Sequence, residues 1–116
     1  MLQFKGEVKM TKVIEYNKLV RDNIPNIINE TGNEYIIHIA DEDEYKGKLL
    51  DKLKEETIEF LENPCEEEIA DILEVIDGLI NHYKFSIINI QDIKYKKSKV
   101  RGKFEKKIIL ERVINP

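Results

Sequence analysis

Apolar residues recur with a helical period in the middle of the chain. Counted at 100° per residue, Leu49, Leu53 and Phe60 point in nearly one direction, which is the pattern of an amphipathic helix with one buried side. Asp41 or Asp43 supplies an acidic start for this helix, where a negative charge complements the helix dipole. The pattern therefore predicts one long helix that ends near residue 62.

A second amphipathic helix is predicted directly after the first. Asn63 and Pro64 form a good helix start, with Asn as the cap and Pro in the first position, where its missing N–H costs nothing. The helix should run to about Tyr83, and its apolar residues repeat every three or four positions. The predicted core face consists of Ile69, Ile72, Leu73, Ile76, Leu79, Ile80 and Tyr83.

Shorter elements are predicted on both sides of this pair of helices. Pro25 fits the first turn of a helix that Asp22 or Asn23 caps. A further helix is expected between Ser86, as its cap, and Gly102, which stops it.

Two segments rich in Ile and Val complete the predicted fold. Residues 35–39 and 104–113 are expected to form short peripheral strands, because β-branched residues are enriched in strands. The sequence thus predicts a mainly α protein with an antiparallel arrangement of helices and a minor β component.

Four acidic residues lie where the two long helices would meet. Glu56 falls inside the apolar arc of the first helix and Glu59 at its border, whereas Glu68 and Asp71 follow one margin of the apolar face of the second. A gap of three residues puts each couple on one side of its helix, with Cβ atoms about 5–6 Å apart. If the helices fold back on each other, the four carboxylates converge, and a hard divalent cation such as Mg²⁺ is their natural occupant. The alternative is that all four are ordinary solvated charges.

The length of the chain indicates a single domain, and its acidic and basic residues are concentrated in different segments. A chain of 116 residues fits one domain, which we assign to residues 10–116, with residues 1–9 as an N-terminal extension outside the fold. Positions 41–77 are acid-rich, whereas residues 94–107 hold eight Lys or Arg and one Glu. This asymmetry suits a metal ion and a polyanion bound side by side. The alternatives are a non-catalytic nucleic-acid-binding module that uses residues 94–107, or a helical interaction domain whose charges are merely solvated.

Other patterns argue against several classes of protein. Cys65 is the only cysteine, so no internal disulfide can form and a reducing cytoplasm is the expected location. No apolar run approaches the roughly 20 residues that a membrane helix needs. The chain also lacks the glycine-rich motifs that cradle phosphates in nucleotide-binding loops.

Four segments together resemble a known enzyme family. They are Tyr16-Asn-Lys-Leu-Val-Arg-Asp-Asn-Ile-Pro-Asn-Ile-Ile28, Leu53-Lys-Glu-Glu-Thr-Ile-Glu-Phe60, Glu67-Glu-Ile-Ala-Asp-Ile-Leu-Glu74 and Arg101-Gly-Lys-Phe104. They are similar to the MazG-like branch of the all-α nucleoside triphosphate pyrophosphatases. More narrowly, they resemble its small house-cleaning members, which are related to phosphoribosyl-ATP pyrophosphohydrolase. The similarity extends over about residues 16–113.

The resemblance implies an antiparallel helical bundle and a hydrolase. The implied reaction is a Mg²⁺-dependent cleavage between the α- and β-phosphates of a nucleoside triphosphate, with Mn²⁺ as a substitute metal, to give a nucleoside monophosphate and pyrophosphate. The implied role is the removal of non-canonical nucleotides. The implied assembly is a homodimer or a higher homo-oligomer, with no membrane and no specific nucleic acid as partner.

The resemblance also assigns residues to roles. The metal ligands would be Glu56, Glu59, Glu68 and Asp71, and either Glu56 or Glu59 would orient or deprotonate the attacking water. The phosphate contacts would come from Lys18, Arg21, Lys99 and Arg101. This chain departs from the subgroup at Asn23, where the subgroup usually has Lys, so no phosphate contact is assigned to that position.

Overall fold

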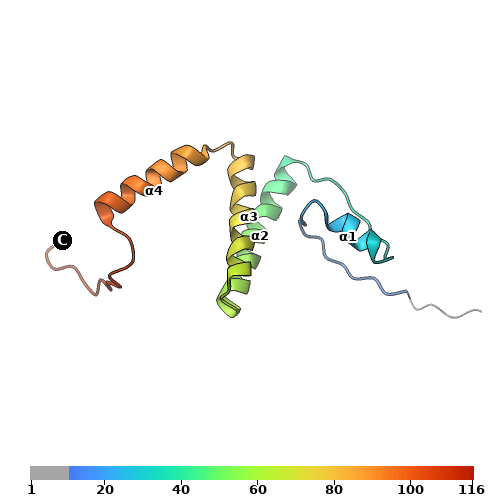
Figure 1. The fold of residues 1–116 in the computed structure, drawn as a ribbon, viewed down its shortest axis with the longest axis horizontal. Helices are drawn as coiled ribbons and strands as arrows, with labels where there is room; N and C mark the ends of the chain where they lie inside the picture. The colour runs from blue at the N-terminus through green and yellow to red at the C-terminus, as the bar shows by residue number, and fades with distance from the viewer. Residues whose placement is uncertain (1–10) are drawn as a thin grey trace, which may run out of the picture. The chain divides into compact units, whose positions relative to one another are not determined.

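The computed structural model describes residues 11–116 and contains four helices in that range (Figure 1). They are α1 (Ile24–Glu30), α2 (Glu42–Glu62), α3 (Glu66–His82) and α4 (Ile87–Arg101). The prediction of a mainly α protein is confirmed. The chain divides into two compact units, with the boundary between Lys48 and Leu49. The predicted N-terminal extension, residues 1–9, lies outside the described residues.

The ends of α1, α2 and α4 follow the signals in the sequence. Asn23 precedes α1 and Pro25 occupies its first turn. Asp41 caps α2, since its Oδ1 accepts a hydrogen bond of 2.8 Å from the backbone N–H of Glu44. Ser86 caps α4 in the same way, because its Oγ accepts a hydrogen bond of 3.2 Å from the backbone N–H of Asn89. Gly102 ends α4 with a φ of +82°, a conformation that favours glycine.

The start of α3 differs from the prediction. The helix begins at Glu66, and Cys65 rather than Asn63 is the residue before it, in an extended conformation with φ −155° and ψ 166°. Pro64 therefore lies in the connection and not in the first turn. Glu66, Glu67 and Glu68 fill that turn, where three negative charges complement the helix N-terminus.

The two predicted strands are wrong. Residues 35–39 and 104–113 contain no strand in the described structure. Ile36 and Phe104 are almost fully exposed, so neither segment has the covered face that β-branched and aromatic residues favour in strands. A strand also requires a neighbour to pair its backbone, and an Ile-rich composition does not supply one. Within residues 35–39, His38 instead makes a side-chain contact, in which its Nε2 lies 2.8 Å from Glu44 Oε1.

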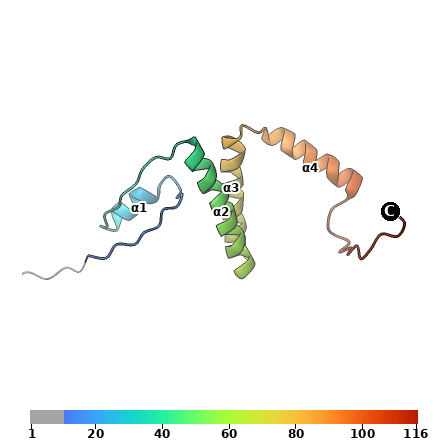
Figure 2. The same cartoon turned by 180° about the vertical axis from the view of Figure 1, so that it is seen from behind.

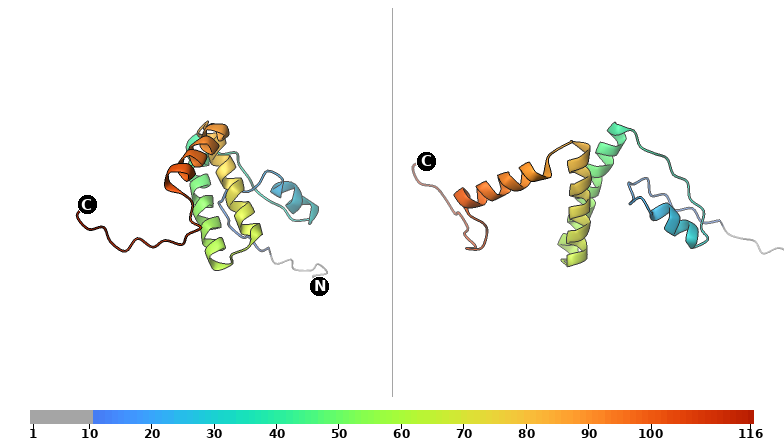
Figure 3. Two further views of the ribbon diagram at one scale, coloured as in Figure 1. Left: turned by 60° about the vertical axis from the view of Figure 1, so that its left-hand side comes forward. Right: turned by 45° about the horizontal axis from the view of Figure 1, so that its top comes forward.

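Helix α3 and the Leu49–Glu62 part of α2 form an antiparallel pair joined by residues 63–65 (Figures 2 and 3). The pair buries little apolar surface, because Leu49, with 3 % of its surface exposed, is the buried hydrophobic residue of the described structure. Glu56 is almost as deeply buried, at 8 %. No helix in the described part of the chain is long and apolar enough to cross a membrane.

The predicted core face of α3 is only partly confirmed. Ile72, Leu79 and Ile80 are half-buried, but Ile69, Leu73, Ile76 and Tyr83 are exposed. The row that contains Glu68, Asp71 and Val75 is half-buried instead. Helix α3 is thus rotated so that its two acids face α2, and the centre of its apolar face remains uncovered.

Candidate metal centre

Glu56 is the buried acid around which the candidate site is built. It lies one turn beyond Lys52 and two turns beyond Leu49 on the same side of α2, so helical spacing carries it into the seam with α3. The prediction that this acid falls inside the apolar arc is confirmed by its burial. A glutamate that served only solubility would lie on the opposite side of the helix.

Helix α3 brings two further carboxylates to Glu56. One carboxylate oxygen from each of Glu56, Glu68 and Asp71 lies within 4.8 Å of the other two, an arrangement that can hold a metal ion. Glu59 lies outside this set of three, but it is close enough to raise the pKa of both Glu56 and Glu68. All four predicted metal ligands therefore meet at one place in the α2–α3 pair.

The meeting of these acids raises the pKa of two of them. Burial is the largest cause for Glu56, followed by the charges of Glu59 and Asp71, and together they raise its pKa above the ordinary 4.5 even though Lys52 acts in the opposite direction. Loss of hydration, followed by the charges of the same two acids, also raises the pKa of Glu68. Without a cation, the site therefore holds more negative charge than its surroundings stabilise.

Two oxygen atoms of the cluster are buried and unsatisfied. Glu56 Oε2 and Glu68 Oε2 have no hydrogen-bond partner within the described residues. A buried charged oxygen without a partner is costly, and a bound cation would remove that cost. Oxygen-only donors suit a hard divalent ion, and Mg²⁺ is commonly held by carboxylates together with substrate phosphates. The residues present thus fit Mg²⁺, and the same donors suit Mn²⁺.

Lys52 is a member of the site that the sequence reasoning missed. Its Nζ lies 3.7 Å from Glu56 Oε1 and 3.6 Å from Glu55 Oε2, and only 19 % of its side chain is exposed. The signal that could have found it is its spacing, since residues four apart on a helix are neighbours. Spacing identifies Lys52 as a neighbour of Glu56 but does not show that its side chain is largely buried, whereas Lys54, two residues later, is exposed.

Three of the predicted phosphate-binding residues each make contacts with residues nearby in the sequence. In the N-terminal unit, the ammonium group of Lys18 lies 5.7 Å from the centre of the Tyr16 ring, and the backbone oxygen of Arg21 accepts a hydrogen bond from Ile24. In α4, the ammonium group of Lys99 lies 5.2 Å from the centre of the Tyr95 ring.

The end of α4 holds a concentration of basic residues. Arg101 is the last residue of the helix, and it borders a hollow of about 660 Å³. Its basic lining residues are Lys99, Arg101, Lys103, Lys106 and Lys107. Such a lining can attract a polyanion.

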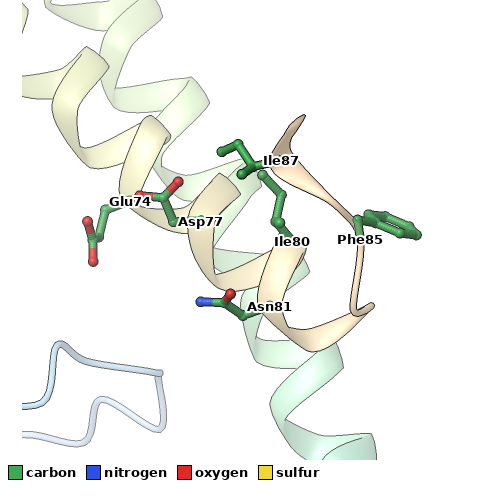
Figure 4. Close-up of a pocket in the computed structure, with 6 residues that line it drawn as sticks. All are labelled: Glu74, Asp77, Ile80, Asn81, Phe85 and Ile87. Carbon is green, nitrogen blue, oxygen red and sulfur yellow. The ribbon is translucent and has the colours of Figure 1, made fainter. Parts of the chain in front are cut away.

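A shallow pocket of about 400 Å³ lies farther along α3. Figure 4 shows Glu74, Asp77 and Asn81 projecting from α3, with Ile87 contributed by the start of α4 and the Phe85 ring pointing away from the other lining residues. The four acids of the candidate site do not line this pocket.

Comparisons with known proteins do not identify a family for this chain. No protein-family model, no curated protein and no solved structure matches this chain.

Proposed function

We propose that this protein is a Mg²⁺-dependent nucleoside triphosphate pyrophosphohydrolase. The observation that carries the proposal is the convergence of Glu56, Glu68 and Asp71, with Glu59 beside them and two buried carboxylate oxygens left unsatisfied. The resemblance in the four sequence segments supplies the reaction, which is cleavage between the α- and β-phosphates. The product pair is a nucleoside monophosphate and pyrophosphate, and the proposed role is to remove non-canonical nucleotides.

The geometry supports separate roles for the acids in metal binding and in proton transfer. Glu56, Glu68 and Asp71 would hold Mg²⁺, since their oxygens lie within 4.8 Å of one another. When bound, the metal supplies positive charge that stabilises the phosphate oxygens as negative charge develops on them. Glu59 lies beside this set and would take the proton of the attacking water. The water oxygen would then bond to the α-phosphorus, the bridging P–O bond between the α- and β-phosphates would break, and pyrophosphate would depart.

Basic side chains would complete the site by binding the phosphates. The resemblance assigns this role to Lys18, Arg21, Lys99 and Arg101. The planar guanidinium groups of the two arginines can each contact two phosphate oxygens, whereas the lysines act as single charges. Their role in the reaction is to hold the triphosphate and to stabilise the departing pyrophosphate.

A pyrophosphate-release assay tests the proposal. The protein is incubated with canonical and damaged nucleoside triphosphates, with and without Mg²⁺, and pyrophosphate is measured. We expect release that requires Mg²⁺, is lost in Asp71→Asn, and is retained in Asp51→Asn, a matched change at an exposed position of α2. The absence of Mg²⁺-dependent release from every triphosphate in the panel would refute the proposal.

The basic hollow at the end of α4 favours a second candidate function, which is binding of nucleic acid by residues 94–107. Binding of that kind falls steeply as salt is added and needs no metal ion. A salt titration against single-stranded and double-stranded oligonucleotides distinguishes the two functions. Tight, salt-sensitive and metal-independent binding without pyrophosphate release would favour the second.

We further propose that the functional form is a homodimer or a higher homo-oligomer. The row of α3 that contains Ile69, Leu73 and Ile76 is an exposed apolar surface along one helix. A second copy can cover it with the same row of its own α3, because a twofold interface places identical surfaces against each other. The resemblance implies the same state of assembly.

A further inference from the structure

Lys52 occupies a position between the acid cluster and the surface of α2. Its ammonium group lies 3.7 Å from Glu56 Oε1, inside the cluster, and 3.6 Å from Glu55 Oε2, which belongs to a side chain that is 32 % exposed. The side chain of Lys52 is itself mostly covered, with 19 % exposed. One positive charge is thus shared between a buried acid that faces α3 and an acid nearer the solvent.

We propose that Lys52 is the resident counter-cation of the metal-free site. Its ammonium group compensates part of the negative charge of the converged carboxylates when no metal is bound, and it gives up Glu56 Oε1 when a divalent cation enters. This inference rests on the proposed metal site, and it adds a positioning residue to that site. Lys52 would thus stabilise the metal-free arrangement of the acids and compete with the metal for Glu56.

The surroundings of Lys52 suit both parts of this role. Glu55 offers the displaced ammonium group an existing partner on the outer side of α2, so metal entry need not leave a buried positive charge. The reach of a lysine side chain allows this shift without a change in the helix, since its stem is flexible. The neighbouring lysines are placed differently: Lys54 is exposed, and Lys48 donates a hydrogen bond to the backbone oxygen of Asn17.

Both consequences of losing the charge of Lys52 should raise the affinity of the site for Mg²⁺. Without Lys52, the metal meets no competing cation, and the carboxylates repel one another more strongly before the metal arrives. We therefore expect Lys52→Met to raise the affinity for Mg²⁺ roughly tenfold, which is the size expected from removing one charge close to a divalent ion. The metal-free protein should melt a few degrees lower, because its acids lose their compensating charge.

The test is a calorimetric titration of the metal-free, full-length protein with MgCl₂, together with melting temperatures in chelator and in Mg²⁺. Lys54→Met is the matched control, since it removes the same charge from an exposed position two residues away and should change the affinity less than about twofold. Lys52→Arg keeps the charge and should stay close to the wild type. Lys52→Gln serves if the methionine variant lacks the helical circular dichroism of the wild type.

The outcomes separate this inference from the proposed function. If the wild type binds Mg²⁺ but Lys52→Met binds it no more tightly than Lys54→Met does, the role of Lys52 is overturned and the metal site stands. If neither the wild type nor Lys52→Met binds Mg²⁺, both proposals are overturned. If Lys52→Met binds Mg²⁺ and the wild type does not, the inference is supported in its strongest form, in which the ammonium group of Lys52 excludes the metal from the site.

Discussion

Glu56 gives the sharpest test of the idea that the acid cluster is unfavourable until a cation binds. Glu56→Gln keeps the size of the side chain and removes one charge. The nearest acids in the cluster lie within 4.8 Å, and two unit charges at that distance repel by about 0.9 kcal/mol in water and by about 3.5 kcal/mol at an effective dielectric constant of 20. The variant also loses the attraction of Lys52, which lies 3.7 Å away and offsets one such repulsion.

The net effect follows from counting the charges around Glu56. Two acids, Glu59 and Asp71, and its own burial disfavour the charge, and one lysine favours it. We therefore expect Glu56→Gln to stabilise the metal-free protein by about 1 kcal/mol. For a chain of 116 residues this corresponds to a rise of about 4 °C in melting temperature.

The assay is thermal unfolding in chelator and in Mg²⁺. The wild type should gain about 2.7 kcal/mol when the free Mg²⁺ concentration is one hundred times its dissociation constant, and the variant should gain much less. Glu74→Gln is the control, because it makes the same change at an exposed position of α3 and should behave like the wild type. A variant that is less stable than the wild type in chelator, yet still stabilised by Mg²⁺, would contradict the reasoning.

Three further predictions follow from the same arrangement. The raised pKa of Glu56 means that the native state binds a proton at this residue more readily than the unfolded chain does. The metal-free wild type should therefore be less stable than Glu56→Gln at neutral pH, and this difference in the free energy of unfolding should shrink as the pH falls towards 4.5. Denaturant unfolding at several pH values measures it. In the proposed reaction Glu59 accepts the proton of the water and is not one of the three closest acids, so Glu59→Gln should lose pyrophosphate release by at least about a hundredfold while Mg²⁺ still raises its melting temperature. Equal loss of both would place Glu59 among the ligands. If the proposed homo-oligomer forms through α3, Leu73→Glu should give a monomer in light scattering, whereas Leu61→Glu at an exposed end of α2 should not. A wild-type monomer would refute the interface.

The helices could be predicted because their signals are local. Asp41 and Ser86 cap their helices through hydrogen bonds to residues three positions later, and Gly102 adopts a conformation that its lack of a side chain allows. The acids could be predicted for a related reason. A three-residue gap fixes which side chains share a helix face, and the short connection of residues 63–65 makes the two helices neighbours.

The features that were mispredicted or missed depend on contacts between elements. The strand expected at residues 35–39 requires a partner that its own composition does not provide. The rotation of α3 depends on which of two adjacent rows meets α2, and the row with Glu68 and Asp71 is covered although the row with Ile69 and Leu73 is more apolar. Lys52 was missed because helical spacing shows that it neighbours Glu56 but not that both side chains are largely buried.

The central claim is that Glu56, Glu68 and Asp71 hold one divalent cation in the seam between α2 and α3, with Glu59 beside them. The most direct test is a crystal structure of the protein grown with Mn²⁺, in which the anomalous signal locates the metal. The account predicts an anomalous peak in direct contact with carboxylate oxygens from both helices. A peak elsewhere on the molecule, or none at a saturating Mn²⁺ concentration, would contradict it.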